Sequence, residues 1–575
     1  MRSILFVFLL PLYIFALPQA INQKINQSGI AKKDVSIYIK EAGAGGKVIA
    51  SLNAEKTRTP ASVIKVLSTY AAVLKLGFNY RWPTKFYAKG KIENGVLYGD
   101  LYIKGFGDPT LKNKDLDKII SYIRAEGIHK ILGNIVIDRS YFKVGNKDSS
   151  GFDENLYSAY NAMPDAMMFN ERVSTICVTP NKDDVYKKNQ DGSYKVINNL
   201  QRVNKPCRGR YSWPGVKIDK TQVVPRVILK GKISKRCGKR NICKVLTKPY
   251  LSFYYALKAK MKEEGIFVSG TLKLHKVPHD ATELFTFYSK SLEEIIAKTA
   301  KKSNNLYARH LLLLLGAKVY GAPATLKKGR EAVMHILASK GALGTGVLRL
   351  DNGSGLSRVA KLNAKLLATM FDNAYDRYGQ RWMKTLSIAG VDGTIKRRFR
   401  GTVVRNRAWM KTGTLKRVKN ISGYVKNKAG KTYTVVILVN STKSRYRGAK
   451  LQNEIIEWLV NGAAQSTTKH SSIKSKSSTK KPKAVLKKKS TKKRILKVSK
   501  KHASKQYYYV QMGTFKRKPS SSYVHKITKL GLPYVLKKSN IYKVLIGPYK
   551  KEATARRILK KVRSRLNKSA FITRQ

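Results

Sequence analysis

Two side chains near the N-terminus, Ser62 and Lys65, have the chemistry and the spacing of a nucleophile and its base. They lie three positions apart at the expected start of a helix, so both would project from one face within hydrogen-bonding distance. Unpaired backbone N–H groups at a helix start stabilise developing negative charge, and a buried lysine near other cations loses its proton more readily. The pair therefore suits a nucleophile and its base, but the same S-x-x-K spacing also occurs at Ser471–Lys474 and Ser477–Lys480, so the pair alone is a weak signal.

Two further groups add to this pair. Ser303-Asn304-Asn305 lies where a loop enters an expected helix and supplies a second hydroxyl and a carboxamide, and Lys411-Thr412-Gly413-Thr414 lies on an expected strand. In isolation, Ser303 would be a helix cap and Lys411 an exposed charge on an edge strand. The order S-x-x-K, S-x-N, K-T-G in matching elements instead favours one shared site.

Periodic segments predict the elements that position these groups. A strand hairpin over 29–52 bends at three glycines, and a helix begins with Thr59 as its cap and Pro60 at its first position and ends at Gly77. Further expected elements are helices over 291–315, 326–339 and 451–459 and strands over 407–415 and 422–440. The stretch from 86 to 285 contains short strand patterns and all four cysteines, which predicts separate β-rich material.

The first residues predict export. Met1-Arg2 precedes an apolar run over 4–17 and then small or polar residues to Ala20, which is the layout of a secretory signal peptide over residues 1–20. An uncleaved membrane anchor is the alternative. No later stretch reaches 18 apolar residues without charges, so no membrane span is expected after cleavage.

The four cysteines fit an exported protein. Two disulfides are the simplest interpretation, and pairing of neighbours predicts Cys177 with Cys207 and Cys237 with Cys243, one of three possible connectivities. Zinc is the alternative, but there is no C-x-x-C pair and the two histidines nearby flank a proline. No metal site is predicted.

The charge is strongly positive, with 116 Lys and Arg against 33 Asp and Glu, or +83. Such a surplus attracts nucleic acid, anionic lipid or acidic wall polymer, although a compositional habit of the organism would also produce it. The linker-like stretch 466–505 holds 16 basic residues and no acidic one. The rest of the charge is spread along the chain instead of being concentrated on one module, and an exported chain is a poor nucleic-acid regulator.

The last segment has its own pattern. Strands are expected over 507–515, 534–538, 542–546 and 570–573 and helices over 520–530 and 552–566, which gives the order βαββαβ. Two strands end in Gly-x-aromatic before a helix, so the two halves echo each other.

The three groups in this order form the signature of penicillin-binding proteins and β-lactamases. The stretch Thr59–Thr69 resembles the active-serine segment of the class C low-molecular-weight penicillin-binding proteins, the D-alanyl-D-alanine carboxypeptidase/endopeptidases of the peptidase family S13 type. Further matching segments are Gly107–Leu111, Leu132–Asp138, Asp351–Arg358 and Lys411–Leu415. The resemblance covers about residues 30–462, and this family carries β-rich domains between its first and second motifs.

The resemblance implies a role for each motif residue. Ser62 would attack the penultimate D-Ala carbonyl with Lys65 as base, and Ser303 would relay a proton to the leaving amine. Asn305 would hold Lys65 and the substrate amide, while Lys411 and Thr412 would bind the terminal carboxylate. The backbone N–H groups of Ser62 and Thr414 would form the oxyanion hole, beside which Gly413 admits the substrate backbone. No cofactor is implied.

The tail resembles the SPOR domain, which binds peptidoglycan glycan strands that lack stem peptides. The matching words are Tyr509–Phe515, Val544–Tyr549 and Ala553–Ala555. Gln511, Thr514 and Tyr542 would then lie on or beside the sheet face that meets sugar. An RNA-recognition fold shares this element order, but its aromatic strand motif is absent.

Together these resemblances imply a multi-domain α/β and β protein, with helices packed on the antiparallel sheet of a transpeptidase-like domain. The expected parts are a signal peptide (1–20), the catalytic domain (21–86 and 286–462), inserted β-rich domains (87–285), a flexible basic linker (463–505) and the SPOR domain (506–575).

The expected function is DD-peptidase action on peptidoglycan stem peptides, with wall glycan as anchor. β-Lactam antibiotics would be covalent inhibitors, and no nucleic-acid partner is expected. Its place would be the periplasm or cell envelope, with enrichment at the division site. The alternative is a catalytically idle wall-binding scaffold.

Overall fold

A computed structural model describes residues 17–462 and, in the C-terminal part, residues 508–515, 519, 527, 532, 534–538, 542–549, 552–565 and 570–574. The chain divides into two compact units, Met1–Lys469 and His470–Gln575. Most of the predicted signal peptide and all of the predicted linker lie outside the described residues. No helix among the described residues is both long enough and apolar enough to cross a bilayer.

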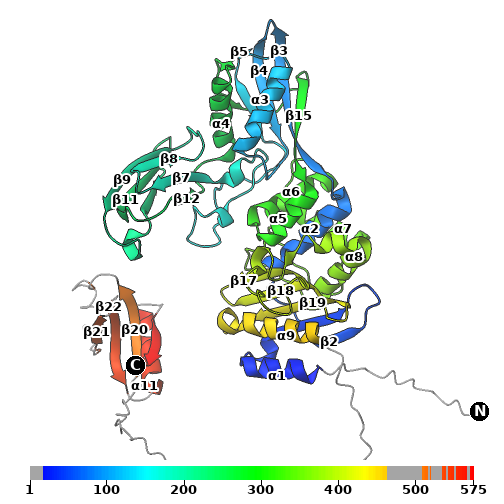
Figure 1. Ribbon diagram of the computed structural model, residues 1–575, viewed down its shortest axis with the longest axis vertical. Coiled ribbons are helices and arrows are strands. Elements are labelled where there is room, and N and C mark those ends of the chain that lie inside the picture. The colour runs from blue at the N-terminus through cyan, green and yellow to red at the C-terminus, as the bar shows by residue number, and fades with distance from the viewer. Residues whose placement is uncertain are drawn as a thin grey trace, which may run out of the picture. The chain divides into compact units, whose positions relative to one another are not determined.

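The first unit contains a six-stranded antiparallel sheet between two layers of helices (Figure 1). Its strands, in spatial order, are β16 (Ser387–Ile388), β17 (Ala408–Leu415), β18 (Val418–Lys426), β19 (Thr432–Asn440), β1 (Val35–Glu41) and β2 (Val48–Leu52). Strands β1 and β2 form the predicted hairpin. The segment predicted as one strand over 422–440 is instead two antiparallel strands, β18 and β19.

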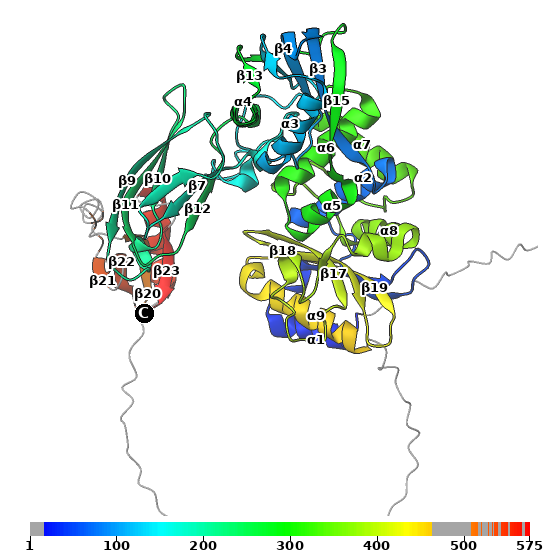
Figure 2. The same ribbon diagram turned by 45° about the horizontal axis from the view of Figure 1, so that its top comes forward.

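The helices cover both faces of this sheet. On one face lie α1 (Gln19–Ser28) and α9 (Ala449–Gly462), and on the other lie α2 (Lys65–Leu76), α5 (Leu292–Lys301), α6 (Asn305–Tyr320), α7 (Leu326–Ser339) and α8 (Ala364–Met383) (Figures 1 and 2). Along β19, Val436 packs with the second helix layer, while its neighbours Val435 and Ile437 pack with α1 and α9. Because both faces are covered, this strand is a continuous apolar run.

The region between α2 and α5 is β-rich, as predicted. Its largest sheet has seven strands: β3 (Arg81–Glu93), β4 (Val96–Gly105), β5 (Lys130–Ile131), β6 (Ile135–Asp138), β13 (Phe267–Val268), β14 (Leu272–Leu274) and β15 (Thr282–Ser291). Two helices that the sequence did not predict, α3 (Leu116–Ala125) and α4 (Pro249–Glu263), share its core. Strands β3 and β15 are paired and run across the predicted domain boundaries at 86/87 and 285/286.

Two three-stranded sheets complete this region. One has the order β10 (Gly215–Asp219), β11 (Arg226–Ser234) and β9 (Lys195–Val203), and the other β12 (Arg240–Lys244), β7 (Ser174–Thr179) and β8 (Asp184–Lys187). Nine buried residues from both sheets and the segments beside them form one hydrophobic cluster. The two sheets therefore share a core.

The predicted cysteine pairing is wrong. The disulfide joins Cys207 to Cys237, whose Cα atoms lie 5.1 Å apart, and Cys177 and Cys243 are free. Cys177 lies opposite Asn241 across the β7–β12 ladder, so Cys243 is two positions out of register with it. Neighbours in sequence failed as a guide because Cys207 and Cys237 follow the ends of two paired parallel strands, β9 and β11, and sequence order does not show which strands pair.

The second unit contains a four-stranded antiparallel sheet. Its strands, in spatial order, are β21 (Tyr534–Lys538), β22 (Tyr542–Tyr549), β20 (Tyr508–Phe515) and β23 (Phe571–Arg574), and α11 (Glu552–Arg565) packs on it. Val510, Val544 and Ile546 face Ala555 and Val562 of the helix in one core. The predicted helix over 520–530 lies outside the described residues except for Ile527.

Candidate active site

Ser62 lies in a single 3₁₀ turn, Ala61–Ile64, that leads directly into α2 at Lys65. The helix ends at Gly77 as predicted, but Thr59 does not cap it. Instead, the hydroxyl of Thr59 accepts a hydrogen bond from Lys361 and its backbone N–H donates to Asn440. The 3₁₀ turn brings Lys65 Nζ to 2.8 Å from Ser62 Oγ.

Lys65 is fully buried and has three polar partners. Its Nζ lies 2.8 Å from Asn305 Oδ1 and also donates to the backbone oxygen of Ser354. The Asn305 and Ser354 oxygens can only accept, whereas the Ser62 hydroxyl accepts from a charged amine or donates its proton to a neutral one. These contacts fix the amine beside the half-buried Ser62 hydroxyl. Asn305 Nδ2 donates in turn to Tyr160 O at 3.0 Å, which orients the carboxamide with its oxygen toward Lys65.

A second lysine–serine pair faces the first. Lys411 Nζ lies 2.9 Å from Ser303 Oγ and donates to Thr412 O at 2.7 Å. The side chain of Thr412 lies 2.9 Å from Thr394 Oγ1 in a turn that precedes β17. Hydrogen bonds thus connect five of the predicted residues: Ser62 with Lys65, Lys65 with Asn305, and Ser303 with Lys411.

Strand β17 passes against the serine turn at Gly413. A Cβ atom at this position would lie 2.7 Å from Pro60 O and 3.0 Å from the backbone nitrogens of Ser62 and Val63. Only glycine allows this approach. The next residue on the strand, Thr414, is exposed. Its backbone N–H as part of an oxyanion hole stays a prediction.

The two lysines differ from exposed lysines in their electrostatics. Burial, together with the charges of Lys411 and Arg309, holds the pKa of Lys65 well below its usual value. Burial also lowers the pKa of Lys411, to about 7. A neutral amine at Lys65 can accept a proton, whereas Lys411 is poised between its charged and neutral forms near neutral pH.

Sequence reasoning missed the role of the Ser354 carbonyl. A backbone acceptor leaves no side-chain signature, although the glycines on either side of Ser354 are a signal: both have positive φ. A Cβ on Gly355 would lie 2.0 Å from Ala61 O, so the segment fits closely against the serine turn. Sequence reasoning also missed Thr394 and Tyr160, whose contacts with the motif residues join distant parts of the chain.

In the second unit, Gln511 lies on the sheet face opposite α11. It opposes Leu545 on one side and Phe571 on the other, and Val535 opposes Leu545, which makes a row of four side chains across the sheet. Gln511 is 7% exposed, whereas Phe571 at the end of the row is 48% exposed. Leu545 beside Gln511 is buried, so Val535 and Phe571 at the two ends of the row supply its apolar surface.

The other two residues predicted to bind glycan are placed differently. Tyr542 shares its strand parity with Val544 and Ile546, which face α11. Thr514 opposes Lys543, which shares its strand parity with Leu545, so the register places Thr514 on the same face as Gln511. Tyr542 lies at a position of the opposite face.

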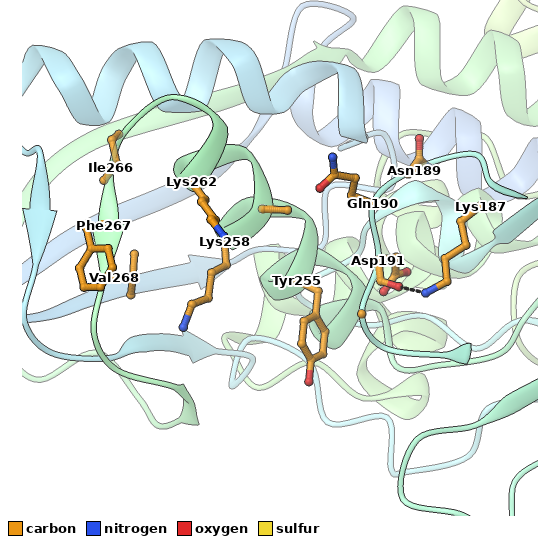
Figure 3. A pocket seen from close by; sticks show the side chains of 12 residues that line it. Lys187, Asn189, Gln190, Asp191, Tyr255, Lys258, Lys262, Ile266, Phe267 and Val268 are labelled. Atoms are coloured by element: carbon orange, nitrogen blue, oxygen red, sulfur yellow. Dashed lines mark hydrogen bonds between the residues drawn. The ribbon is translucent and has the colours of Figure 1, made fainter. Parts of the chain in front are cut away.

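A pocket of about 650 Å³ lies elsewhere in the first unit, between α4, β13 and the loop after β8 (Figure 3). Two of its three lysines are engaged: Lys187 donates to the backbone oxygens of Asp191 and Tyr194, and Lys258 donates to Gly270 O at 2.9 Å. None of the motif residues lines it. We therefore place the chemistry at the serine–lysine centre, where several polar groups converge.

Comparison with known proteins agrees with this geometry. Residues 17–462 match the D-Ala-D-Ala carboxypeptidase 3 (S13) family, and residues 504–574 match the SPOR domain. The chain is 27% identical over 438 residues to D-alanyl-D-alanine carboxypeptidase DacB of Haemophilus influenzae, which covers 74% of this chain and 90% of that protein. It is 28% identical over 406 residues to a D-alanyl-D-alanine carboxypeptidase of an Actinomadura species, covering 67% and 74% of the two proteins.

A solved structure shows the same fold. The crystal structure of penicillin-binding protein 4 from Haemophilus influenzae superposes with a TM-score of 0.65 at 24% identity, covering 76% of this chain and 99% of that one. The matched family range spans the six-stranded sheet, both helix layers and the β-rich region. The chain belongs to the D-Ala-D-Ala carboxypeptidase 3 (S13) family of serine hydrolases, and it carries a C-terminal SPOR domain.

Proposed function

We propose that this protein is an active serine DD-peptidase that acts on peptidoglycan stem peptides through an acyl-enzyme on Ser62. The observation that carries this proposal is the position of Lys65 Nζ, 2.8 Å from both Ser62 Oγ and Asn305 Oδ1. A buried, neutral amine in hydrogen-bonding contact with a serine hydroxyl is the arrangement that activates the nucleophile.

In the proposed first half-reaction, Ser62 Oγ forms a bond to the penultimate D-Ala carbonyl carbon as its proton passes to Lys65. The C–N bond then breaks, and the leaving amine receives a proton through Ser303. The Lys411–Ser303 contact of 2.9 Å supports this route because it links the second hydroxyl to a second amine. Water then hydrolyses the ester and releases the shortened peptide with Ser62 restored.

The substrate carboxylate would bind at Lys411 and Thr412. An ammonium group and a hydroxyl are the donors that a terminal carboxylate requires. The contact between Thr412 and Thr394 would fix the orientation of the Thr412 hydroxyl. A β-lactam, which has a carboxylate and a strained amide, would enter by the same contacts and acylate Ser62.

Product analysis tests this proposal. Purified muropeptide monomers ending in D-Ala-D-Ala, and crosslinked dimers, are incubated with the wild-type protein and with Ser62→Ala. Loss of one alanine mass from the monomers reports carboxypeptidase activity, and conversion of dimers to monomers reports endopeptidase activity. We expect both with the wild type and neither with Ser62→Ala. Intact substrates in both samples would favour the alternative, a catalytically idle scaffold.

We propose that the SPOR domain anchors the enzyme to wall glycan. The row of Gln511 supports this through its exposed apolar ends, Val535 and Phe571, because an apolar side chain beside an amide suits the face and hydroxyl groups of a sugar. We further propose export through the signal peptide 1–20 to the periplasm or cell envelope, and enrichment at the division site. We also propose the division predicted from the sequence, with a catalytic domain over 21–86 and 286–462, inserted β-rich domains over 87–285, a linker over 463–505 and the SPOR domain over 506–575.

A further inference from the structure

The turn formed by Asn170, Glu171 and Arg172 has three successive non-glycine residues with positive φ, at 49°, 55° and 59°. This backbone conformation is unfavourable for residues with a Cβ atom, and strained backbone of this kind is concentrated at functional sites. The turn belongs to the β-rich region, in the segment between β6 and β7. Its strain requires support from surrounding contacts.

Contacts on both sides hold this turn in place. The backbone N–H of Asn170 donates to Leu111 O at 3.0 Å, and its side-chain oxygen accepts from the N–H of Asn113 at 3.1 Å. On the other side, Arg172 forms an ion pair with Asp148. These contacts fix the turn to the β-rich region. The Glu171 side chain takes no part in them and makes its contacts outside the turn.

The Glu171 carboxylate reaches the catalytic motif. One oxygen accepts from Lys112 at 2.6 Å, Lys298 at 2.7 Å and Tyr307 at 3.2 Å, and the other accepts from Asn304 Nδ2 at 3.1 Å. Lys298 lies near the end of α5 and Tyr307 in the first turn of α6. Glu171 therefore binds both helices that flank Ser303 and also the middle residue of the S-x-N motif.

The motif itself needs such support. Ser303 has a positive φ of 53°, and Asn304 caps α6 through a hydrogen bond from the N–H of Tyr307. A change in the rotamer of Asn304 would alter the backbone on either side of it, where Ser303 contacts Lys411 and Asn305 contacts Lys65. The hydrogen bonds from Lys112 and Lys298 outweigh the effect of burial on Glu171 and keep its pKa below the usual value.

We propose that Glu171 is a positioning residue for acylation, which holds Ser303 and Asn305 in register with the two lysines by binding Asn304, Lys298 and Tyr307. This inference rests on the proposed function. It assigns the β-rich region a second task besides any contact with substrate, because one of its turns completes the support of the second catalytic motif.

Acylation kinetics of the full-length protein test this inference. Glu171→Gln keeps the shape of the side chain but removes its charge, and Glu283→Gln is the matched control, since Glu283 pairs with Lys85 at 2.7 Å in the same region without contacting α5 or α6. Stopped-flow reaction with a fluorescent penicillin separates the acylation rate at saturation from the half-saturating concentration. We expect Glu171→Gln to lower the saturating rate about 10- to 100-fold, as a small misplacement of catalytic groups does. The half-saturating concentration and the control should stay at wild-type values.

Two further variants separate positioning from a loss of folding. Tyr307→Phe removes only the hydroxyl that contacts Glu171 and Lys298, and it should lower the rate by roughly the 2- to 10-fold that one hydrogen bond is worth. Asn304→Ala should add little to Glu171→Gln, because both act on the same turn.

The outcomes are distinct. Wild-type rates in both Glu171→Gln and Tyr307→Phe, or strictly additive effects of Glu171→Gln and Asn304→Ala, would overturn the positioning role while the proposed function stands. A wild-type protein that the penicillin does not label would overturn both. Melting curves show whether each variant is folded at the assay temperature.

Discussion

At the scale of single residues, the site works through two buried lysines with different surroundings. Lys65 is close enough to the charges of Lys411 and Arg309 for both to oppose its protonation. Arg309 is 1% exposed, and two of its three guanidinium nitrogens, Nε and Nη2, have no hydrogen-bond partner among the described residues. A buried cation of this kind, even with the charge of Asp351 nearby, favours the neutral form of a neighbouring amine.

These shifts predict a bell-shaped pH dependence of acylation. As pH falls, Lys65 becomes protonated and can no longer accept the serine proton, so the rate declines on the acid side. As pH rises, Lys411, whose pKa is about 7, loses the charge that would bind the carboxylate, so the rate declines on the alkaline side. Because Lys65 and Lys411 interact, the apparent pKa values of the acid and alkaline limbs describe the two lysines together.

The measurement is the second-order rate of penicillin acylation from pH 5 to 10 in the wild type and in Lys411→Arg. The guanidinium stays charged over this range, so the alkaline limb should move to higher pH in the variant. A wild-type rate that keeps rising to pH 10, as for a lysine with an ordinary pKa, would contradict this description of the site.

At the scale of elements, the site is assembled where a 3₁₀ turn, a helix cap and a strand meet. The strand approaches so closely at Gly413 that a Cβ atom would collide with the serine turn. Residue types in a fixed order were enough to predict Ser62, Lys65, Ser303, Asn305 and Lys411 as one group. The strand that carries Lys411 was also predicted. The helix expected over 291–315 is instead two helices, α5 and α6, with Ser303 between them, and Ser62 lies in a 3₁₀ turn before α2.

The remaining features were not predictable from the sequence for physical reasons. The Ser354 carbonyl and the Tyr160 carbonyl act through the backbone, which leaves no residue-type signal. Glu171 contacts Asn304 across 133 positions, and no local pattern indicates such a contact. The same limit applies to the cysteines, because the disulfide joins segments that follow the paired strands β9 and β11.

Thiol reactivity tests the corrected cysteine assignment. Native protein, without reductant, should react with an aromatic disulfide reagent at about one thiol, the exposed Cys243, because Cys177 is buried. Unfolding without reductant should raise the count to two, and reduction should raise it to four. A count of zero in the unfolded, unreduced protein would show that Cys177 and Cys243 are also bridged.

At the scale of the whole molecule, two units with separate cores carry separate chemistry. The first contains the serine–lysine centre, and the second has its own hydrophobic core of buried strand and helix residues. The second unit is also basic, with 18 Lys and Arg against a single acidic residue over 506–575. Charge alone would attract this unit to any acidic polymer, so its binding to the wall must be measured at both low and high salt concentration.

The isolated segment 506–575 should bind insoluble peptidoglycan, and binding should increase when an amidase removes stem peptides. High salt screens charge within about 3 Å at 1 M, so binding that persists there comes from sheet-to-sugar contacts. Gln511→Ala and Phe571→Ala should weaken this salt-resistant fraction. If high salt eliminates binding and stripping of stem peptides has no effect, the segment is only a polycationic anchor.

The central claim is that Ser62 is the acylated residue. Mass mapping after reaction with penicillin tests it directly: the mass of the antibiotic should be added to the peptide that contains Ser62. Ser62→Ala should abolish the adduct without lowering the melting temperature, and Lys65→Ala should slow its formation by roughly 10²- to 10⁴-fold, the usual contribution of a general base. An adduct on another peptide, or labelling that persists in Ser62→Ala, would contradict the mechanism.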